Sequence, residues 1–247
     1  AKKIGNGALA VVVPEYNRAH ITKAWWELKN LPLIFPNKPY LKEKIEKNAY
    51  VQDKEAKEIL KKIGNRKIIL YQGILTKERP LDKFIKAIDQ LGDKYAFVVM
   101  SSGENIYEKI ESKNYYFIPF VKPPMHLEIT SHAYIGVLSY IPVKSHYSIL
   151  NAIYCAPNKI YEYSMFGIPM LGNDIPGLRY AFDTSGAGIC IYNFDENLII
   201  QGIKSIENNY EKYTYNSKKF YESLDLRTQL TDILENLGNQ MKLLEDK

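Results

Sequence analysis

The sequence predicts an α/β fold with a doubly wound, Rossmann-like parallel sheet. From Lys67 onward, short apolar runs alternate with amphipathic stretches of helix length, which is the pattern of strands joined by crossover helices. The expected strands are Lys67–Tyr71, Ala96–Met100, Tyr115–Pro119, Ile135–Ser139, Ile168–Leu171 and Gly188–Ile191. The expected helices are Leu81–Leu91, Asn105–Glu111, Met125–His132, Asn158–Phe166 and Gly177–Phe182. Loops at the carboxyl ends of such strands meet at one edge of the sheet, where ligands bind.

The first residues follow another pattern. A strand over Leu9–Val13, a helix near Arg18–Lys29 and a strand over Leu33–Phe35 precede a lysine-rich polar stretch. Prolines at 32, 36 and 39 stiffen this connection and indicate an interdomain linker. We therefore expect residues 1–40 to be the remnant of a separate lobe with its linker, and residues 41–225 to form the Rossmann-like domain.

The C-terminal stretch after Ile199 has a helical pattern, expected as three segments. The last, within residues 226–247, has apolar side chains on one face, at Leu226, Leu230, Ile233, Leu234 and Leu237. This stripe is expected to pack against another surface.

Composition excludes several classes of protein. The 247 residues are 46% hydrophobic and 25% charged, with a mean hydropathy of −0.30, as in an ordinary globular protein. The longest apolar run, Ala8–Val13, is too short to span a bilayer, and no signal peptide is evident. A cytoplasmic protein is expected, with peripheral association at the inner face of the membrane as a further expectation. The lysines behind the net charge of +5 are scattered, so no nucleic-acid partner is expected.

The cysteines and histidines do not predict a metal site or a disulfide framework. Cys155 and Cys190 are expected to be free thiols, and the spacing of Cys and His matches no zinc site. His126 and His132 fall on one expected helix without the spacing of metal ligands. No metal and no cofactor are therefore predicted.

The stretch from Ala156 to Pro169 is the most informative part of the sequence for function. Asn158 is a candidate N-cap, and the free amides of the following turn can hold an anion. Lys159 and Glu162 are three residues apart, so they project from nearly the same face of the helix. A cation here suits a diphosphate, and a carboxylate one turn later can accept hydrogen bonds from the vicinal hydroxyls of a ribose. The alternative is a solvated Lys/Glu pair on a surface helix.

Pro157–Tyr163 followed by Gly167–Pro169 resembles a motif of the retaining GT-B glycosyltransferases of glycosyltransferase family four. The family motif has two glutamates eight residues apart, and the second binds the ribose of the donor nucleotide. Glu162 matches that second glutamate. Tyr154 stands where the first, which contacts the donor sugar, would be.

A second resemblance begins at Ile69 and continues through Gly73 and Arg79. It is similar to the first strand and loop of the family's donor lobe, in which a glycine allows close backbone approach and a cation contacts the diphosphate. Ile74 replaces the arginine that often follows the glycine. The alternatives are a tight turn for Gly73 and a solvent contact for Arg79.

Weaker resemblances follow in the expected order along the chain. The loop ending at Gly103 is similar to the loop after the family's second strand, and the segment with Phe120 and Val121 to the segment that lies against the nucleotide base. The resemblance thus implies that Gly73, Arg79, Gly103, Phe120, Val121, Asn158, Lys159 and Glu162 bind the donor. No catalytic residue is predicted.

The resemblance implies an enzyme that transfers a hexose from a nucleotide diphosphate sugar to a glycan or lipid-linked acceptor, with retention, in polysaccharide biosynthesis. The nucleotide sugar is then a substrate and not a cofactor. Val13–Arg18 and Leu33–Pro39 resemble the last βα unit of the acceptor lobe, so the chain is expected to be only part of the enzyme. The resemblance also implies that the helix within residues 226–247 returns towards the N-terminal lobe. The alternatives are a non-catalytic α/β module that binds a glycan or a partner protein, and a nucleotide-sugar epimerase of the same fold.

Overall fold

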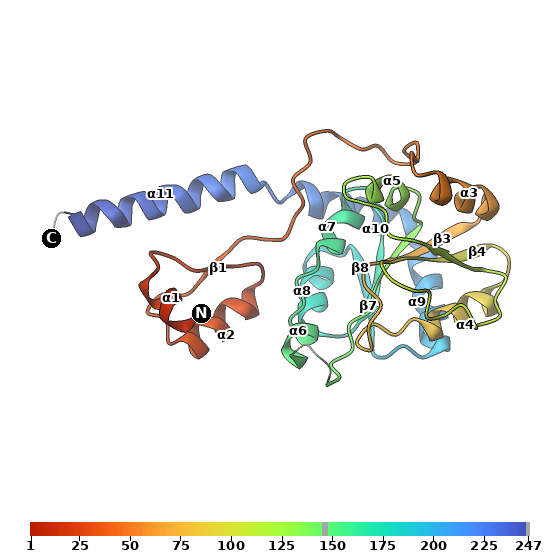
Figure 1. Cartoon of the computed structure of the whole chain (residues 1–247), viewed down its shortest axis with the longest axis horizontal. Coiled ribbons are helices and arrows are strands. Elements are labelled where there is room, and N and C mark those ends of the chain that lie inside the picture. The colour runs from red at the N-terminus through yellow and green to blue at the C-terminus, as the bar shows by residue number, and fades with distance from the viewer. Residues whose placement is uncertain (145–147, 246–247) are drawn as a thin grey trace.

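The computed structural model describes residues 1–144 and 148–245 and has a six-stranded parallel sheet at its centre (Figure 1). The strand order is β5-β4-β3-β6-β7-β8, so the chain winds outward in both directions from the β3/β6 pair. This confirms the predicted doubly wound parallel sheet. The strands are β3 (Lys67–Gln72), β4 (Tyr95–Met100), β5 (Tyr115–Ile118), β6 (Ile135–Leu138), β7 (Met170–Asn173) and β8 (Gly188–Ile191).

Helices cover both faces of the sheet. Because side chains alternate along a strand, Ile68 and Leu70 of β3 belong to one apolar core, whereas Ile69 and Tyr71 belong to the other. The first core contains residues from α3 (Lys54–Ile63), α5 (His126–Thr130), α7 (Asn158–Ser164) and α8 (Pro176–Ser185). The second core contains residues from α4 (Asp82–Leu91) and α9 (Glu196–Asn208).

Two strand boundaries differ from the predicted ones because of prolines. β5 ends at Ile118, and β7 begins at Met170. Pro119 and Pro169 lie just outside these strands, since proline has no N–H to donate to the ladder. The backbone carbonyl of Pro169 still accepts a hydrogen bond from Gly136 N at 2.9 Å.

The helix predicted over Asn105–Glu111 is wrong. This segment forms successive turns, with Glu108 N donating to Asn105 O and Ile110 N to Tyr107 O. The side chain of Asn105 accepts from Tyr107 N at 3.2 Å, and such a local bond favours a turn over a helix.

Three helices were not predicted: α1 (Lys2–Gly7), α3 and α6 (Ile149–Ile153). The lysine-rich stretch contains α3, which begins where the carboxylate of Asp53 accepts from Ala56 N at 2.9 Å. Its buried residues, Ala56 and Ile63, are seven apart and so lie on one face. This N-cap and this spacing were readable in the sequence.

The N-terminal residues form a small unit beside the main domain (Figure 1). β1 (Val12–Val13) pairs in parallel with β2 (Leu33–Ile34), and α2 (Tyr16–Trp26) connects them. Both strands are shorter than predicted. Arg18 of α2 joins the unit to the main domain, because its guanidinium donates to Tyr154 O at 2.7 Å and to Asn151 Oδ1 at 3.0 Å.

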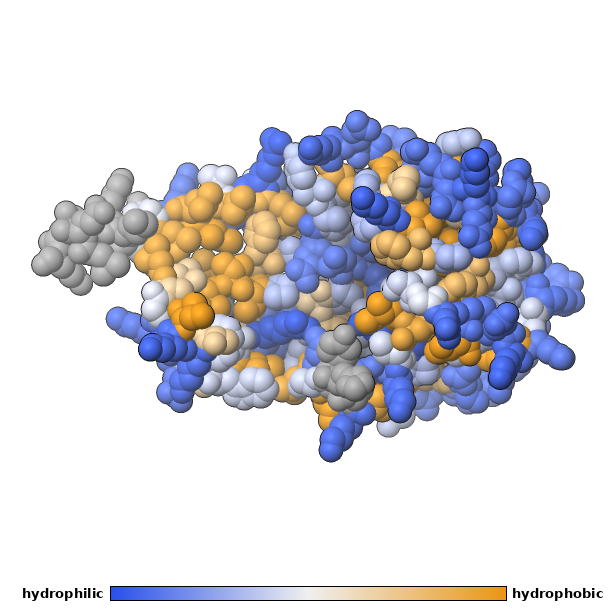
Figure 2. Space-filling model, in the orientation of Figure 1, coloured by the Kyte–Doolittle hydropathy of each residue, from blue (hydrophilic) through white to orange (hydrophobic). Residues whose placement is uncertain are grey.

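The C-terminal stretch has the three predicted helical segments, α9, α10 (Tyr210–Glu222) and α11 (Leu226–Glu245). Figure 1 shows α11 extending beyond the main domain on the side of the N-terminal unit. Within this chain, Leu230 and Leu234 of its apolar stripe are 47% and 58% exposed, so the expected packing of the stripe stays a prediction. Val12 and Ile34 are exposed too, and Figure 2 shows an apolar surface over this end of the molecule.

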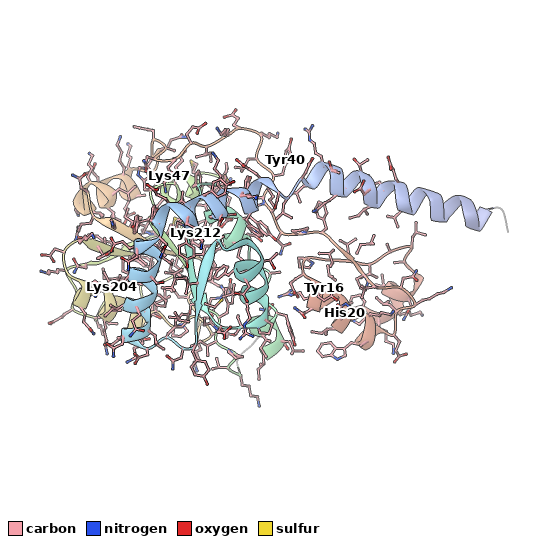
Figure 3. All side chains as sticks on the ribbon, turned by 180° about the vertical axis from the view of Figure 1, so that it is seen from behind. Tyr16, His20, Tyr40, Lys47, Lys204 and Lys212 are labelled. Atoms are coloured by element: carbon pink, nitrogen blue, oxygen red, sulfur yellow. The ribbon has the colours of Figure 1, made fainter. Side chains whose placement is uncertain are left out.

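Lysines are spread over the surface. Figure 3 shows Lys47, Lys204 and Lys212 apart from one another, the last two on α9 and α10. In the described part of the chain, no helix combines the length and the apolar character that crossing a bilayer requires.

Candidate functional site

A pocket of about 350 Å³ opens beyond the carboxyl ends of β3, β4 and β6. The register pairs Gln72 with Met100, so the loops after β3 and β4 leave the sheet side by side. The pocket is lined by residues that include seven of the predicted donor-binding residues: Gly73, Arg79, Phe120, Val121, Asn158, Lys159 and Glu162. The predicted residue Gly103 does not line the pocket. Its φ of 97° instead suits the turn after β4.

Gly73 allows its loop to approach Lys159 closely. Its φ is 133°, in a region that residues with a side chain rarely adopt, and a Cβ atom here would lie 3.3 Å from Lys159 Nζ. The backbone N–H of Gly73 also donates to Met100 O at 3.0 Å. The glycine therefore provides both the turn and the space for the lysine.

Lys159 is a buried cation. The residue is only 7% exposed, and its Nζ has no hydrogen-bond partner among the described residues. The ammonium lies 4.3 Å from the ring centroid of Tyr71 and 5.1 Å from that of Tyr140. Burial, followed by repulsion from Arg79, lowers the pKa of Lys159 to about 7. An anion in the pocket would supply the missing partner.

Arg79 lies near the same Tyr140 ring as Lys159. Its guanidinium carbon is 5.1 Å from the centroid of Tyr140. Tyr140 is 5% exposed and is thus shared by two cations in a space with little water. Two positive groups around one ring attract a ligand with more than one negative charge, such as a diphosphate.

Glu162 is a buried carboxylate that other side chains hold in place. It is 9% exposed, and its Oε2 accepts a hydrogen bond from Gln72 Nε2 at 2.5 Å. Its Oε1 lies 3.4 Å from His126 Nε2. Thr130 in turn donates to Gln72 Oε1 at 2.6 Å. The carboxylate therefore keeps one orientation towards the pocket.

The interpretation of Lys159 and Glu162 as a solvated surface pair is wrong, because both side chains are buried against the pocket. The predicted N-cap is also wrong. Pro157, with φ −78° and ψ 138°, occupies the N-cap position, and Asn158 is the first helical residue of α7. Pro157 has the extended backbone that an N-cap requires, and no side chain caps this helix.

Several residues of the pocket were not predicted. Gln72, Tyr140 and His126 line it, and Tyr71 lies beneath Lys159. Gln72 carried a weak signal, since a polar residue ends an otherwise apolar strand, β3. The tyrosines and His126 carried none, because their positions depend on which strands and helices become neighbours.

The cysteines are free, as predicted, and Cys155 is buried. Burial raises the pKa of the Cys155 thiol to about 12, so it is not a nucleophile at neutral pH. Within residues 1–144 and 148–245, no group of three or more His, Cys, Asp or Glu side chains is arranged to hold a metal ion.

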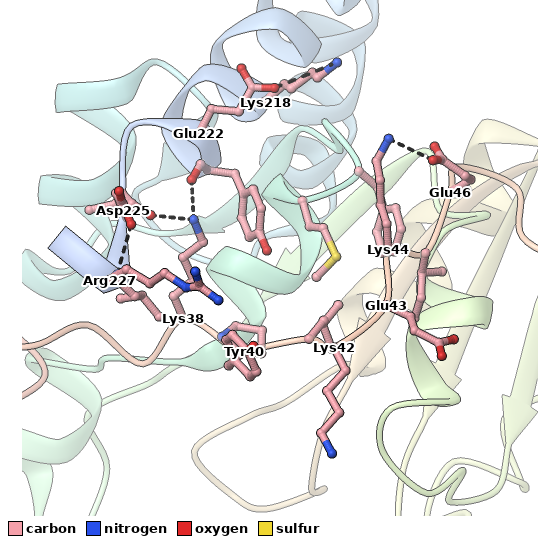
Figure 4. Close-up of a pocket in the computed structure, with 18 of the residues that line it drawn as sticks. Lys38, Tyr40, Lys42, Glu43, Lys44, Glu46, Lys218, Glu222, Asp225 and Arg227 are labelled. Carbon is pink, nitrogen blue, oxygen red and sulfur yellow. Dashed lines mark hydrogen bonds and ion pairs between the residues drawn. The ribbon is translucent and has the colours of Figure 1, made fainter. Parts of the chain in front are cut away.

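A larger hollow of about 730 Å³ is lined by residues 38–47, where the predicted linker continues into the main domain (Figure 4). Its charges are largely paired. Lys44 lies 2.8 Å from Glu46, and Lys38 donates to the carbonyls of Tyr221 and Leu224 at 2.7 and 2.6 Å. This hollow thus has no buried, unpaired group comparable to Lys159 among the described residues.

No protein-family model and no curated protein matches the chain. Solved structures of similar fold include Anabaena Alr3699/HepE in complex with UDP and glucose, with a TM-score of 0.65, 12% identity, and coverage of 96% of this chain and 65% of that chain. A glycosyltransferase from Rickettsia africae has a TM-score of 0.65 and 12% identity, with coverage of 98% and 67%. Sucrose-phosphate synthase from Thermosynechococcus elongatus has a TM-score of 0.61 and 16% identity, with coverage of 99% and 59%.

The chain therefore spans roughly three-fifths to two-thirds of the length of these proteins, from 59% to 67%. At such low identities the similarity concerns the fold. The sheet order, the helices on both faces and these neighbours together show that the chain has the Rossmann-like fold of a GT-B glycosyltransferase lobe.

Proposed function

We propose that this chain is the nucleotide-sugar-binding lobe of a retaining glycosyltransferase similar to family four. The complete enzyme would transfer a hexose from a nucleotide diphosphate sugar to a glycan or lipid-linked acceptor in polysaccharide biosynthesis. One observation carries the proposal: a buried lysine with no hydrogen-bond partner among the described residues and an oriented carboxylate share a pocket at the carboxyl edge of the sheet. The similarity of the fold to HepE, which was solved with UDP and glucose, supports it.

In the proposed complex, each part of the nucleotide has a group of matching chemistry. Lys159 and Arg79 contact the diphosphate, with the backbone at Asn158 beside them. Glu162 accepts hydrogen bonds from the ribose hydroxyls. Phe120 and Val121 lie against the base, since Phe120 is 62% exposed and both line the pocket.

The proposed catalytic task of these residues is to stabilise the leaving group. As the bond between the anomeric carbon and the phosphate oxygen breaks, negative charge grows on the diphosphate. Lys159 and Arg79 are already positioned, in surroundings poor in water, so their interaction with that charge strengthens without reorganisation. The resemblance to retaining enzymes implies that the leaving phosphate itself helps to take the proton of the acceptor.

Calorimetry with UDP, GDP and ADP tests the proposal. We expect the wild-type chain to bind at least one of them, and Glu162→Ala to bind about tenfold or more weakly, because hydrogen bonds to a charged group are lost. Ser217→Ala is the matched control, since Ser217 is buried and donates to Ile168 O outside the pocket. Failure to bind any of the three nucleotides, or equal binding by Glu162→Ala, would contradict the proposal. Glycan binding without nucleotide dependence would favour the non-catalytic module instead.

We also propose that the protein acts in the cytoplasm, peripherally associated with the inner face of the membrane. The net charge of +5 supports attraction to anionic lipids. Sedimentation with anionic and neutral vesicles tests this, and equal partitioning to both would contradict it.

A further inference from the structure

A chain of hydrogen bonds connects Glu162 to the interior of the domain. It begins at Thr130, the last residue of α5, passes through Gln72 at the end of β3 and reaches Glu162 on α7. Thr130, Gln72 and Glu162 are 0%, 4% and 9% exposed. Three elements thus meet at a polar network that is shielded from water, and such networks hold their members in one geometry.

The hydrogen bonds of this network have a defined direction. A carboxylate only accepts, so the NH₂ group of Gln72 must face Glu162, and Gln72 Oε1 must face Thr130. The hydroxyl of Thr130 then donates to Gln72 Oε1 at 2.6 Å. Flipping the amide would place its oxygen against the carboxylate. Thr130 therefore fixes the orientation of Gln72, and Gln72 fixes that of Glu162.

His126 completes the environment of the carboxylate. Its Nε2 is 3.4 Å from Glu162 Oε1, which only accepts, so the ring proton lies on Nε2. Its Nδ1 is buried without a hydrogen-bond partner among the described residues, so Glu162 is the side chain with which the ring interacts through Nε2.

The remaining acceptor capacity of Glu162 matches a vicinal diol. A carboxylate offers about four lone-pair sites, two on each oxygen. Gln72 occupies a site on Oε2, and His126 occupies a site on Oε1. Each oxygen thus keeps one free site for the pocket. The two adjacent hydroxyls of a ribose can donate to both oxygens, whereas a 2′-deoxyribose leaves one of these two acceptor sites without a donor from the ligand.

We propose that Gln72, Thr130 and His126 are positioning residues that make Glu162 selective for ribose over 2′-deoxyribose. This inference rests on the proposed function. It adds that the pocket distinguishes ribose from 2′-deoxyribose, and it names the residues responsible for that selectivity. Thr130 and Gln72 do not contact the nucleotide directly in this scheme. They act through the orientation of the carboxylate.

The test compares the affinities of UDP, GDP and ADP with those of their 2′-deoxy counterparts by calorimetry. For the wild type we expect a preference for the ribonucleotide of about ten- to hundredfold, the effect of one hydrogen bond to a charged acceptor. In Gln72→Met and Thr130→Val this preference is expected to fall to the level of Glu162→Ala. Thr130→Ser keeps the hydroxyl and is expected to keep the preference.

Two controls separate positioning from general damage to the fold. In Gln72→Met the hydroxyl of Thr130 can still donate to His126 O, 3.0 Å away, so no new buried donor is left unpaired. Ser217→Ala removes a buried hydroxyl outside the pocket, and it is expected to leave the ratio of the two affinities unchanged. His126→Phe is expected to lower the ratio less than Gln72→Met, because its bond to Glu162 is longer.

The outcomes distinguish this inference from the proposed function. Wild-type binding with an undiminished preference in both Gln72→Met and Thr130→Val would overturn the positioning role and leave the function standing. Loss of the preference in Ser217→Ala, or in Thr130→Ser as fully as in Thr130→Val, would also overturn it. If the wild type binds none of the nucleotides, the proposed function fails and the inference fails with it.

Discussion

The two hollows described above, one lined by residues 38–47 and one at the edge of the sheet, differ in whether their charged groups have partners. The larger one contains ion pairs at the surface, such as Lys44 with Glu46, whose side chains are 82% and 71% exposed. The smaller one, at the edge of the sheet, contains Lys159, which is 7% exposed and has no hydrogen-bond partner in the described part of the chain. The smaller hollow is therefore the better candidate for a binding site.

This difference shows that the volume of a hollow is a poor guide to function. An exposed ion pair contributes about 0–1 kcal/mol and tolerates change. A buried, unpaired cation destabilises the fold, so its presence indicates a role in binding or catalysis. Glu162 differs from Lys159 in this respect, because side chains of the protein already contact its carboxylate and hold it in place. The pocket thus combines one group that lacks a partner with one that is positioned.

The largest expected effect concerns nucleotide affinity. We expect Lys159→Met to weaken the binding of the nucleoside diphosphate by about a hundredfold, because a buried charge-assisted contact to the phosphates is lost. Lys44→Met, in the other hollow, is expected to change the affinity by less than about twofold. Calorimetry on both variants measures the contrast. A similar loss in both would remove the distinction between the two hollows.

The second prediction is a pH dependence. The pKa of Lys159 is about 7 in the free protein, and an adjacent diphosphate would raise it, so binding takes up a proton. Affinity is therefore expected to fall as the pH rises above about 7, by up to about tenfold per pH unit. Titrations between pH 7 and 9 in buffers of different ionisation enthalpy measure both effects.

Two variants serve as controls for this pH dependence. Lys159→Met is expected to bind weakly with little dependence on pH over this range, because the titrating group is gone. Glu162→Ala keeps the lysine and so keeps the slope. Its midpoint is expected at lower pH, because Glu162 raises the pKa of Lys159. A wild-type affinity that is constant from pH 7 to 9 would show that Lys159 does not change its charge on binding.

The third prediction concerns stability, where the two hollows should respond with opposite signs. Lys159→Met is expected to raise the free energy of unfolding of the free chain by about 1 kcal/mol, as often happens when a functional buried charge is removed. Lys38→Met is expected to lower it by about 1 kcal/mol, because two hydrogen bonds to carbonyls are lost. Urea unfolding measures both.

The stabilisation by Lys159→Met also has a pH dependence of known sign. The folded-state pKa of Lys159 is about 7 and its ordinary value is 10.5, so the unfolded chain binds more protons between these values. The stability of the wild type therefore rises with pH in this window. The advantage of the methionine variant should be largest below about pH 7 and should decrease as the pH rises towards 10.5. A constant advantage would contradict this account.

The smallest expected effect lies at the surface of the larger hollow. Lys44→Ala breaks the pair with Glu46 and is expected to change the free energy of unfolding by less than about 0.5 kcal/mol. A change of several kcal/mol would show that the linker pairs contribute to the fold as strongly as buried contacts do.

Much of the fold was predictable because its signals are local. Each strand of the main sheet is a short apolar run, and each lies within a few residues of its predicted position. The spacing of Lys159 and Glu162 on one helix was also visible along the chain. The turn at Asn105 was missed because the hydrogen bond from Tyr107 N to the Asn105 side chain favours a turn over a helix. The helix α3 was missed although its Asp53 N-cap is a local signal in the sequence.

The sequence by itself determined the fold class and the pair of charged residues at the start of α7. The tertiary structure decided which groups surround them. Thr130 and Gln72 are 58 residues apart, and Gln72 and Glu162 are 90 apart, yet they form one network. Burial and hydrogen bonding depend on such distant neighbours, so whether Lys159 is unpaired or Glu162 is oriented follows only from how β3, α5 and α7 pack together.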